Sequence, residues 1–165
     1  MEAQPAQSDL ERALDLAYHA VARRERTIAE LRTCLERKRV RPVAIDAAVE
    51  QLCEAGLLDD ARYARRFAED KRELERWGRE RIARDLHRRG VPPELIEAAV
   101  TDPGRDAELE TAVLLLEHRF QTPPKSDRER NRAWGLLIRR GYTPEIAYDA
   151  VRAYEHRSPD GRRAA

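Results

Sequence analysis

Residues able to catalyse a reaction or hold a metal ion are few in this chain, and their spacing fits no familiar site. The histidines form neither a His-Glu-x-x-His pattern nor a cluster with cysteine at metal-ligand spacing. They are scattered, at His19, His87, His118 and His156. No serine lies in a Gly-x-Ser-x-Gly turn, and the seven glycines form no phosphate-binding or dinucleotide-binding loop. The sequence therefore predicts a protein that works by binding, with no catalytic residue, metal or cofactor.

Charged residues are the stronger signal. They make up 38% of the chain, yet the net charge is only +1. Between Arg62 and Arg89, eleven basic residues stand against six acidic ones, a local net charge of +5. This stretch supplies ten candidate residues for binding a partner: Arg62, Arg65, Arg66, Lys71, Arg72, Arg79, Arg81, Arg84, Arg88 and Arg89. Two interpretations stay open, a solvated helix face with interleaved acids and a patch for an acidic protein groove or a phosphate backbone.

Trp77, Cys34 and Cys53 lead to predictions about the core, and the lack of long apolar runs leads to one about the cellular compartment. Trp77 lies at an expected break between two helices, where it is either a core residue, the interpretation we favour, or an interface anchor. Cys34 and Cys53 fall on apolar helical stripes without a Cys-x-x-Cys pair, which predicts buried, reduced thiols. Because no apolar run is long enough to span a membrane and no secretion signal begins the chain, we expect a cytoplasmic protein.

An internal repeat with a period of 51 residues organises the chain. The segments that begin at Leu35, Leu86 and Leu137 align without gaps, and a basic residue, a proline, an alanine and a valine also coincide in all three copies. Matches at one fixed offset are hard to attribute to composition. We therefore expect three similar units, with each leucine buried against the next helix of its own unit.

Each copy reads as a helix, a break and a second helix. The first turn of the second helix, where a missing N–H costs nothing, coincides with the aligned prolines Pro42, Pro93 and Pro144. Gly90 and Gly141 precede two of these prolines and fit the left-handed residue that ends a helix. In the first copy Arg39 replaces the glycine, so we expect a more strained exit there.

A further helix precedes each of these pairs. We expect it to begin near Leu10 in the first unit, after Asp59 and Asp60 in the second, and after Asp102 and Pro103 in the third.

The expected units span residues 9–56, 57–101 and 102–156, with a flexible tail at 157–165. Because three short helices bury little core alone, neighbouring units must share apolar surface. The predicted fold class is all-α, with three tandem three-helix repeats stacked into an elongated, curved array.

The middle of the chain carries a specific combination of residues. In order, these are Gly56-Leu57-Leu58-Asp59-Asp60, Arg62-Tyr63-Ala64, Phe67, Gly78, Arg81-Ile82, Leu86 and Gly90-Val91. In these residues the chain resembles the RecX family of regulators of the RecA recombinase. The segment from Ala22 to Lys38 is similar to the family's first unit, and the resemblance extends from about Leu14 to Tyr154.

The resemblance implies a partner that the repeat alone does not. Members of the family consist of three tandem three-helix units, bind the RecA filament on DNA, and inhibit its ATPase, strand exchange and coprotease activities. It thus implies the RecA recombinase filament as partner, with a contact to filament-bound single-stranded DNA left open, and neither a membrane nor a small-molecule substrate. Capping of filament ends and binding along the filament groove both stay open.

A helix-turn-helix DNA-binding protein is the alternative, because three-helix units with an arginine-rich second helix share features with that motif. Three copies at equal spacing fit an extended array better than a single recognition helix. The third unit also follows an acidic stretch, which from Glu94 to Glu117 has a net charge of −6. We therefore favour the regulatory protein.

Overall fold

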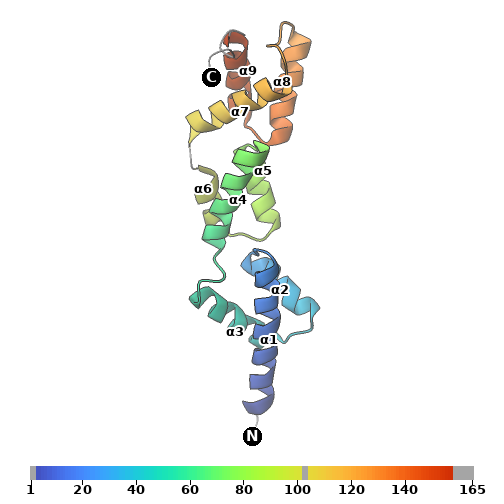
Figure 1. Cartoon of the computed structure of the whole chain (residues 1–165), viewed down its shortest axis with the longest axis vertical. Coiled ribbons are helices and arrows are strands. Elements are labelled where there is room, and N and C mark those ends of the chain that lie inside the picture. Colours follow the sequence, from blue (N-terminus) through green and yellow to red (C-terminus); the bar gives the residue numbers. More distant parts are fainter. Residues whose placement is uncertain (1–2, 102–103, 158–165) are drawn as a thin grey trace. The chain divides into compact units, whose positions relative to one another are not determined.

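The fold is all-helical, as predicted. A computed structural model describes residues 3–101 and 104–157, and within these ranges it has nine α-helices and no strand (Figure 1). The helices are α1 (Ala3–Arg23), α2 (Ile28–Arg37), α3 (Pro42–Glu54), α4 (Asp60–Glu75), α5 (Arg79–Arg88), α6 (Pro93–Thr101), α7 (Arg105–Arg119), α8 (Asp127–Arg140) and α9 (Pro144–His156). They follow one another as three triplets, in agreement with the three-helix repeat.

The prolines and glycines of the repeat begin and end helices as predicted. Pro42, Pro93 and Pro144 are the first residues of α3, α6 and α9. Gly90 and Gly141 have φ angles of +76° and +89°, which only glycine adopts without steric cost. Each of these glycines lets the chain leave one helix and enter the next within a few residues.

Arg39 takes the same left-handed backbone although it is not glycine. Its φ is +58°, a conformation that costs a residue with a Cβ about 1–2 kcal/mol. The side chain of Arg39 is exposed. The strained exit expected for the first repeat is therefore confirmed.

The first helix is longer than predicted. α1 begins at Ala3 rather than near Leu10. Alanine and glutamine upstream of Leu10 sustain a helix, and Pro5 falls within the first turn, where a proline is tolerated.

The start of α7 and the end of the chain fall partly outside the described residues. α7 begins at Arg105, and the expected cap at 102–103 lies outside the described ranges. Of the expected tail only Arg157 is described, and its guanidinium donates to Glu110 at 2.8 Å and to Glu117 at 3.1 Å. The other eight residues of that segment lie outside the described part of the chain.

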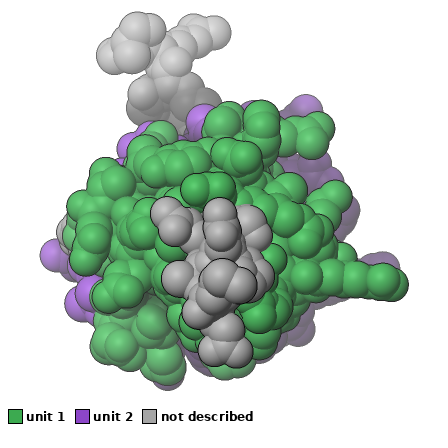
Figure 2. Space-filling view, turned by 90° about the horizontal axis from the view of Figure 1, so that it is seen from below, with its two compact units in different colours: residues 1–66, 86–96 green, residues 67–85, 97–165 purple. Residues whose placement is uncertain are grey.

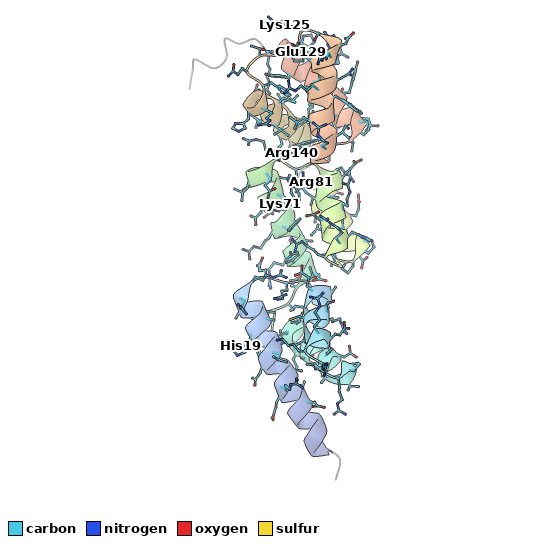
Figure 3. All side chains as sticks on the ribbon, turned by 90° about the vertical axis from the view of Figure 1, so that its right-hand side faces the viewer. His19, Lys71, Arg81, Lys125, Glu129 and Arg140 are labelled. Carbon is cyan, nitrogen blue, oxygen red and sulfur yellow. The ribbon has the colours of Figure 1, made fainter. Side chains whose placement is uncertain are left out.

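The start of α8 is closed by its own side chains. The hydroxyl of Ser126 accepts a hydrogen bond from the N–H of Glu129 at 3.3 Å. In return the carboxylate of Glu129 accepts from the N–H groups of Lys125 at 2.7 Å and of Ser126 at 3.2 Å; Lys125 and Glu129 are labelled in Figure 3. These bonds, first that from Lys125, lower the pKa of Glu129. The first N–H groups of α8 are thus satisfied locally.

Asp59 closes the start of α4, where its Oδ1 accepts from the N–H of Arg62 at 2.9 Å, and this bond lowers the pKa of Asp59. We expect Asp59→Ala to lower the free energy of unfolding by about 0.5–2 kcal/mol at pH 7. Since the folded state has the lower pKa, this stabilisation is present above the ordinary aspartate pKa of about 4 and disappears as the pH falls through the folded-state value. Urea denaturation at neutral and at acidic pH measures it, and a pH-independent loss would contradict the role of the charge.

The helices group into two compact units. Unit 1 comprises residues 1–66 and 86–96, and unit 2 comprises residues 67–85 and 97–165, coloured green and purple in Figure 2. Helices α4, α5 and α6 therefore contribute residues to both units.

Unit 1 has a core formed mainly by α1, α2 and α3. Its buried residues are Ala13, Ala17, Ala20, Leu31, Leu35, Val40, Ala44, Ile45, Ala48, Val49, Leu52 and Leu58. The alanines of α1 recur every three or four residues and so share one face of the helix. Because these side chains are small, α1 can lie close to its neighbours.

Unit 2 has a core formed by α7, α8 and α9. Its buried residues are Ala112, Val113, Leu115, Leu116, Ala133, Leu137, Tyr142, Ile146, Ala147, Ala150, Val151 and Tyr154. Tyr142 is fully buried, burial raises its pKa, and its hydroxyl donates to the carbonyl of Arg76 at 2.9 Å. Trp77 is only 7% exposed, which confirms the favoured interpretation of this residue as part of the core.

The burial of the aligned leucines and of the two cysteines tests the predicted apolar helix faces. Leu35, Leu86 and Leu137 are each 0% exposed, so their predicted burial is confirmed. Cys34 and Cys53 are free thiols, but both are half-buried, and the prediction of full burial is wrong. They lie at the edge of the unit 1 core, whose centre the leucines occupy. None of the helices in the described ranges combines the length and the apolarity needed to cross a membrane.

Candidate partner-binding surface

A junction in unit 1 joins the end of α5 to the start of α2. The hydroxyl of Thr27, which is fully buried, donates to the carbonyl of Arg89 at 2.6 Å and accepts from the N–H of Glu30 at 3.1 Å. Gly90 lies so close to α2 that an added Cβ would come within 2.4 Å of the Cβ of Ala29. The last carbonyls of α5 therefore meet the first turn of α2, where the opposite ends of two helix dipoles attract.

Two carboxylates hold this junction together. Glu30 accepts ion pairs from Arg89 at 2.8 Å and from Arg24 at 2.9 Å. Asp60 is buried and accepts a hydrogen bond from the N–H of Ile28 at 2.9 Å. Burial raises the pKa of Asp60, against the opposing effect of that bond. The ion pairs of Glu30 thus fix the positions of the Arg24 and Arg89 side chains.

A groove of about 550 Å³ opens at this junction, and we call it the junction groove. It is lined by Arg24, Arg26, Ala29, Glu30, Thr33, Cys34, Arg37, Lys38, His87, Arg88, Arg89 and Gly90. Six basic side chains and one histidine stand against a single carboxylate, so the groove is a concave surface with a positive field. Such a surface attracts phosphates and carboxylates.

Arg37 and Lys38 are the most available cations of the junction groove. Both are exposed. Among the residues that the structure describes, no carboxylate lies within ion-pair distance of either side chain. A partner can therefore bind them without breaking an internal ion pair.

The junction groove contains two of the ten predicted residues, Arg88 and Arg89. Its other cations, Arg24, Arg26, Arg37 and Lys38, were not among the predicted residues. A charge count extended to residues 23–41 finds eight basic and three acidic residues, the same net charge of +5 as in the middle stretch. That signal could have identified them.

Three predicted residues lie on the part of α4 in unit 1. Arg62 donates to the carbonyl of Gly56 at 2.8 Å, and Arg66 pairs with Glu25 at 2.5 Å. Arg65 is exposed, and the described part of the chain provides it with no ion pair. Of these three, Arg65 is therefore the one free to meet a partner.

The other five predicted residues lie in unit 2. Arg72 donates to two carbonyls near the end of α6, at 2.9 and 3.0 Å. Arg79 pairs with Glu97 at 3.3 Å. Arg84 is exposed and makes no ion pair with a described residue. Arg72 thus closes a helix end, whereas Arg84 faces solvent.

Lys71 and Arg81 flank the ring of Trp77. The Arg81 guanidinium lies 3.9 Å and the Lys71 Nζ 4.9 Å from the ring centroid. Figure 3 labels both, together with Arg140 of α8, which donates to the carbonyl of Glu75 at 2.7 Å. Most of the ten predicted residues therefore hold parts of the fold together, and five of the ten belong to unit 1 and five to unit 2.

Comparison with known proteins decides the family. A family model described as "RecX, second three-helix domain" matches residues 59–100. A protein named Regulatory protein RecX from Trichlorobacter lovleyi is 37% identical over 134 residues, which cover 79% of this chain and 87% of that protein. This chain belongs to the RecX family. The protein of the same name from Mycolicibacterium smegmatis is 32% identical over 157 residues, covering 91% of this chain and 83% of its own length.

Solved RecX structures share this fold. The crystal structure of RecX from Lactobacillus salivarius matches with a TM-score of 0.83 at 18% identity, over 90% of this chain and 98% of that one. A crystal structure of regulatory protein RecX matches with a TM-score of 0.79, also at 18% identity, over 92% of this chain and 76% of that one. This chain therefore shares its fold with both structures.

The described residues offer no metal site to complement the junction groove. Within residues 3–101 and 104–157, no group of three or more histidine, cysteine, aspartate or glutamate residues is placed to hold a metal ion. The junction groove offers shape and charge, and the chemistry that these can perform is the recognition of anions.

Proposed function

We propose that this RecX-family chain binds the RecA recombinase filament and inhibits its ATPase, strand exchange and coprotease activities. The observation that carries the proposal is the junction groove, with six cations and one carboxylate. A recombinase filament on single-stranded DNA carries phosphates and acidic side chains, and a concave cationic surface attracts both. The name shared by the relatives, Regulatory protein RecX, supports a regulatory role.

The contact surface in this proposal is the junction groove together with the exposed Arg65, all in unit 1. The exposed Arg84 of unit 2 is a separate candidate contact. Charge-assisted hydrogen bonds from arginine to phosphate or carboxylate are the strong members of their class. The other six predicted residues, which contact groups within their own unit, are Arg62, Arg66, Lys71, Arg72, Arg79 and Arg81. Neither a membrane nor a small-molecule substrate enters the proposal.

Co-sedimentation tests the proposal. The chain is mixed with the host's RecA recombinase on single-stranded DNA with ATP, with naked single-stranded DNA, and with naked duplex DNA, each at low and moderate salt. We expect the chain to sediment with the filament and to lower its ATPase rate, and both effects to weaken as salt screens the charges. Tight, sequence-selective binding to naked duplex DNA without any effect on the ATPase would instead support the helix-turn-helix alternative.

A further inference from the structure

A second groove, of about 760 Å³, lies between α8 and α9 in unit 2, and we call it the aromatic groove. It is lined by Asp127, Arg130, Asn131 and Trp134 of α8 and by Tyr148, Val151, Arg152 and Glu155 of α9. On each helix the four positions are i, i+3, i+4 and i+7, which form one continuous face over two turns. Two such faces side by side form a groove into which the side-chain ridge of a third helix can pack.

The aromatic groove exposes two large rings. Trp134 is 40% and Tyr148 57% exposed, whereas Val151 between them is buried. The Arg152 guanidinium lies 5.7 Å from the centroid of the Tyr148 ring. Tryptophan, tyrosine and arginine are the residues that carry most binding energy at protein interfaces.

The internal repeat indicates that the fold does not need these rings. One repeat period before Trp134 and Tyr148 stand Ala83 and Glu97, and two periods before them stand Arg32 and Asp46.

In the first repeat these two positions form an ordinary surface ion pair. Arg32 and Asp46 lie 2.6 Å apart, with side chains 42% and 62% exposed. Nearly the same exposure thus belongs to an ion pair in one repeat and to two aromatic rings in another. Water accepts the ion pair without cost but the rings only at a cost in exposed apolar area. Exposed rings at these two positions are therefore the pattern expected of an interaction surface.

The charges around the aromatic groove favour a protein over a nucleic acid. Arg130 pairs with Asp127 at 2.6 Å and with Glu155 at 2.5 Å. Arg152 contacts the Tyr148 ring, and no carboxylate of the described residues pairs with it. Two acids and two arginines leave the lining neutral, and the two carboxylates would repel a phosphate backbone. A partner with an apolar side chain and one acidic group fits this pattern.

We propose that the aromatic groove docks a helical segment of the recombinase. An aliphatic side chain of that segment packs between Trp134 and Tyr148, and a neighbouring carboxylate pairs with Arg152. The identity of the partner rests on the proposed function. The contact is mainly apolar, with a single ion pair, so it should depend less on salt than the junction groove does.

Replacing the two rings by the ion pair of the first repeat tests this proposal. The variant Trp134→Arg/Tyr148→Asp copies a pair that the fold already accommodates, so the helical content measured by circular dichroism should stay unchanged. We expect its affinity for the recombinase filament to fall at least about ten-fold. Loss of the apolar contact should account for more of this decrease than loss of the ionic contact. Leu74→Gln, which removes an apolar side chain that is 78% exposed on α4 without adding charge, is the control and should bind like the parent.

The two tryptophans of the chain provide a direct reporter. In a Trp77→Phe background, 5-hydroxytryptophan is incorporated at Trp134 so that it can be excited separately from the recombinase, and acrylamide quenching is measured. We expect filament binding to protect this probe, and naked single-stranded DNA to leave it unprotected. In the complementary Trp134→Phe background, the probe at the buried Trp77 should show little quenching with or without filament.

Each other outcome has a definite meaning. If the parent chain does not bind filaments at all, the proposed function fails and this inference fails with it. If the parent binds but the double variant binds equally well, or Trp134 stays equally quenched, only the aromatic groove is excluded. Protection by naked single-stranded DNA would identify a nucleic acid as the occupant and overturn the proposal of a recombinase helix.

Discussion

Gly141→Ala is expected to lower the free energy of unfolding by about 3 kcal/mol or more. In unit 2 the residue has a φ of +89°, and a Cβ added there would lie 2.3 Å from the Arg81 Cβ and 2.4 Å from the Arg81 N. The left-handed backbone alone costs a residue with a Cβ about 1–2 kcal/mol, and forcing a methyl group into a packed contact costs about 1–3 kcal/mol more. Thermal and urea unfolding of parent and variant measure the sum.

Gly56→Ala separates these two costs. Gly56 has a φ of +66°, but nothing lies within 4 Å of the position that a Cβ would occupy. Only the backbone cost of about 1–2 kcal/mol should therefore appear. Equal losses for the two variants would show that the close approach of Gly141 to Arg81 adds nothing to stability.

Arg37→Glu/Lys38→Glu is expected to weaken inhibition of the recombinase ATPase at least about ten-fold at low salt, because steering and binding at a charged surface depend on its field. The substitution takes the junction groove from a net +5 to +1. Both side chains are exposed, so the fold should persist. The assay measures ATP hydrolysis against concentration of the chain at two ionic strengths, and the difference from the parent should shrink as salt rises.

The third repeat provides a matched control for the single substitution Arg37→Glu. Arg139 stands two repeat periods after Arg37, is also exposed, and lies outside the junction groove. Arg139→Glu therefore introduces the same charge at the same place in a helix, including any penalty at the helix end. If Arg37→Glu and Arg139→Glu weaken inhibition equally, the effect belongs to total charge and the junction groove has no special role.

Much of the fold could be predicted because its signals are local or periodic. Prolines at helix starts, glycines at helix ends and the buried leucines all recur at one offset, so a single sequence contains three versions of the same evidence. The close approaches could not be predicted in this way. Gly90 and Ala29 are far apart in the chain and meet only because one repeat lies against another, and no local pattern records which neighbour a glycine faces.

The candidate surface was harder to predict for the same reason. A count of charges along a helix does not distinguish Arg72, which closes the end of α6, from Arg84, which faces solvent. The junction groove combines cations from the segment before α2, from the end of α2 and from the end of α5. Its charge is therefore divided between two stretches of sequence. The exposure of Trp134 also needed the structure, because aromatic residues on a helix are more often part of a core.

Two helix ends, one in each unit, are closed to the kind of junction that joins helices within the units. In unit 2 the N–H groups of Gly78 and Glu80, at the start of α5, donate to the carbonyls of Arg140 and Gly141 at the end of α8, at 2.9 and 3.0 Å. A head-to-tail junction of that type could in principle continue from molecule to molecule as an open-ended polymer.

The end of α2 in unit 1 and the start of α8 in unit 2 depart from the pattern that such a polymer needs. At the end of α2, Arg39 carries a Cβ where the two internal junctions require glycine, and Arg12 already donates to the carbonyl of Lys38 at 3.1 Å. At the start of α8, Ser126 and Glu129 occupy the N–H groups that an incoming helix end would need. We therefore expect neither helix end to join a second copy of the chain, so that a solution of the protein stays free of filaments of its own.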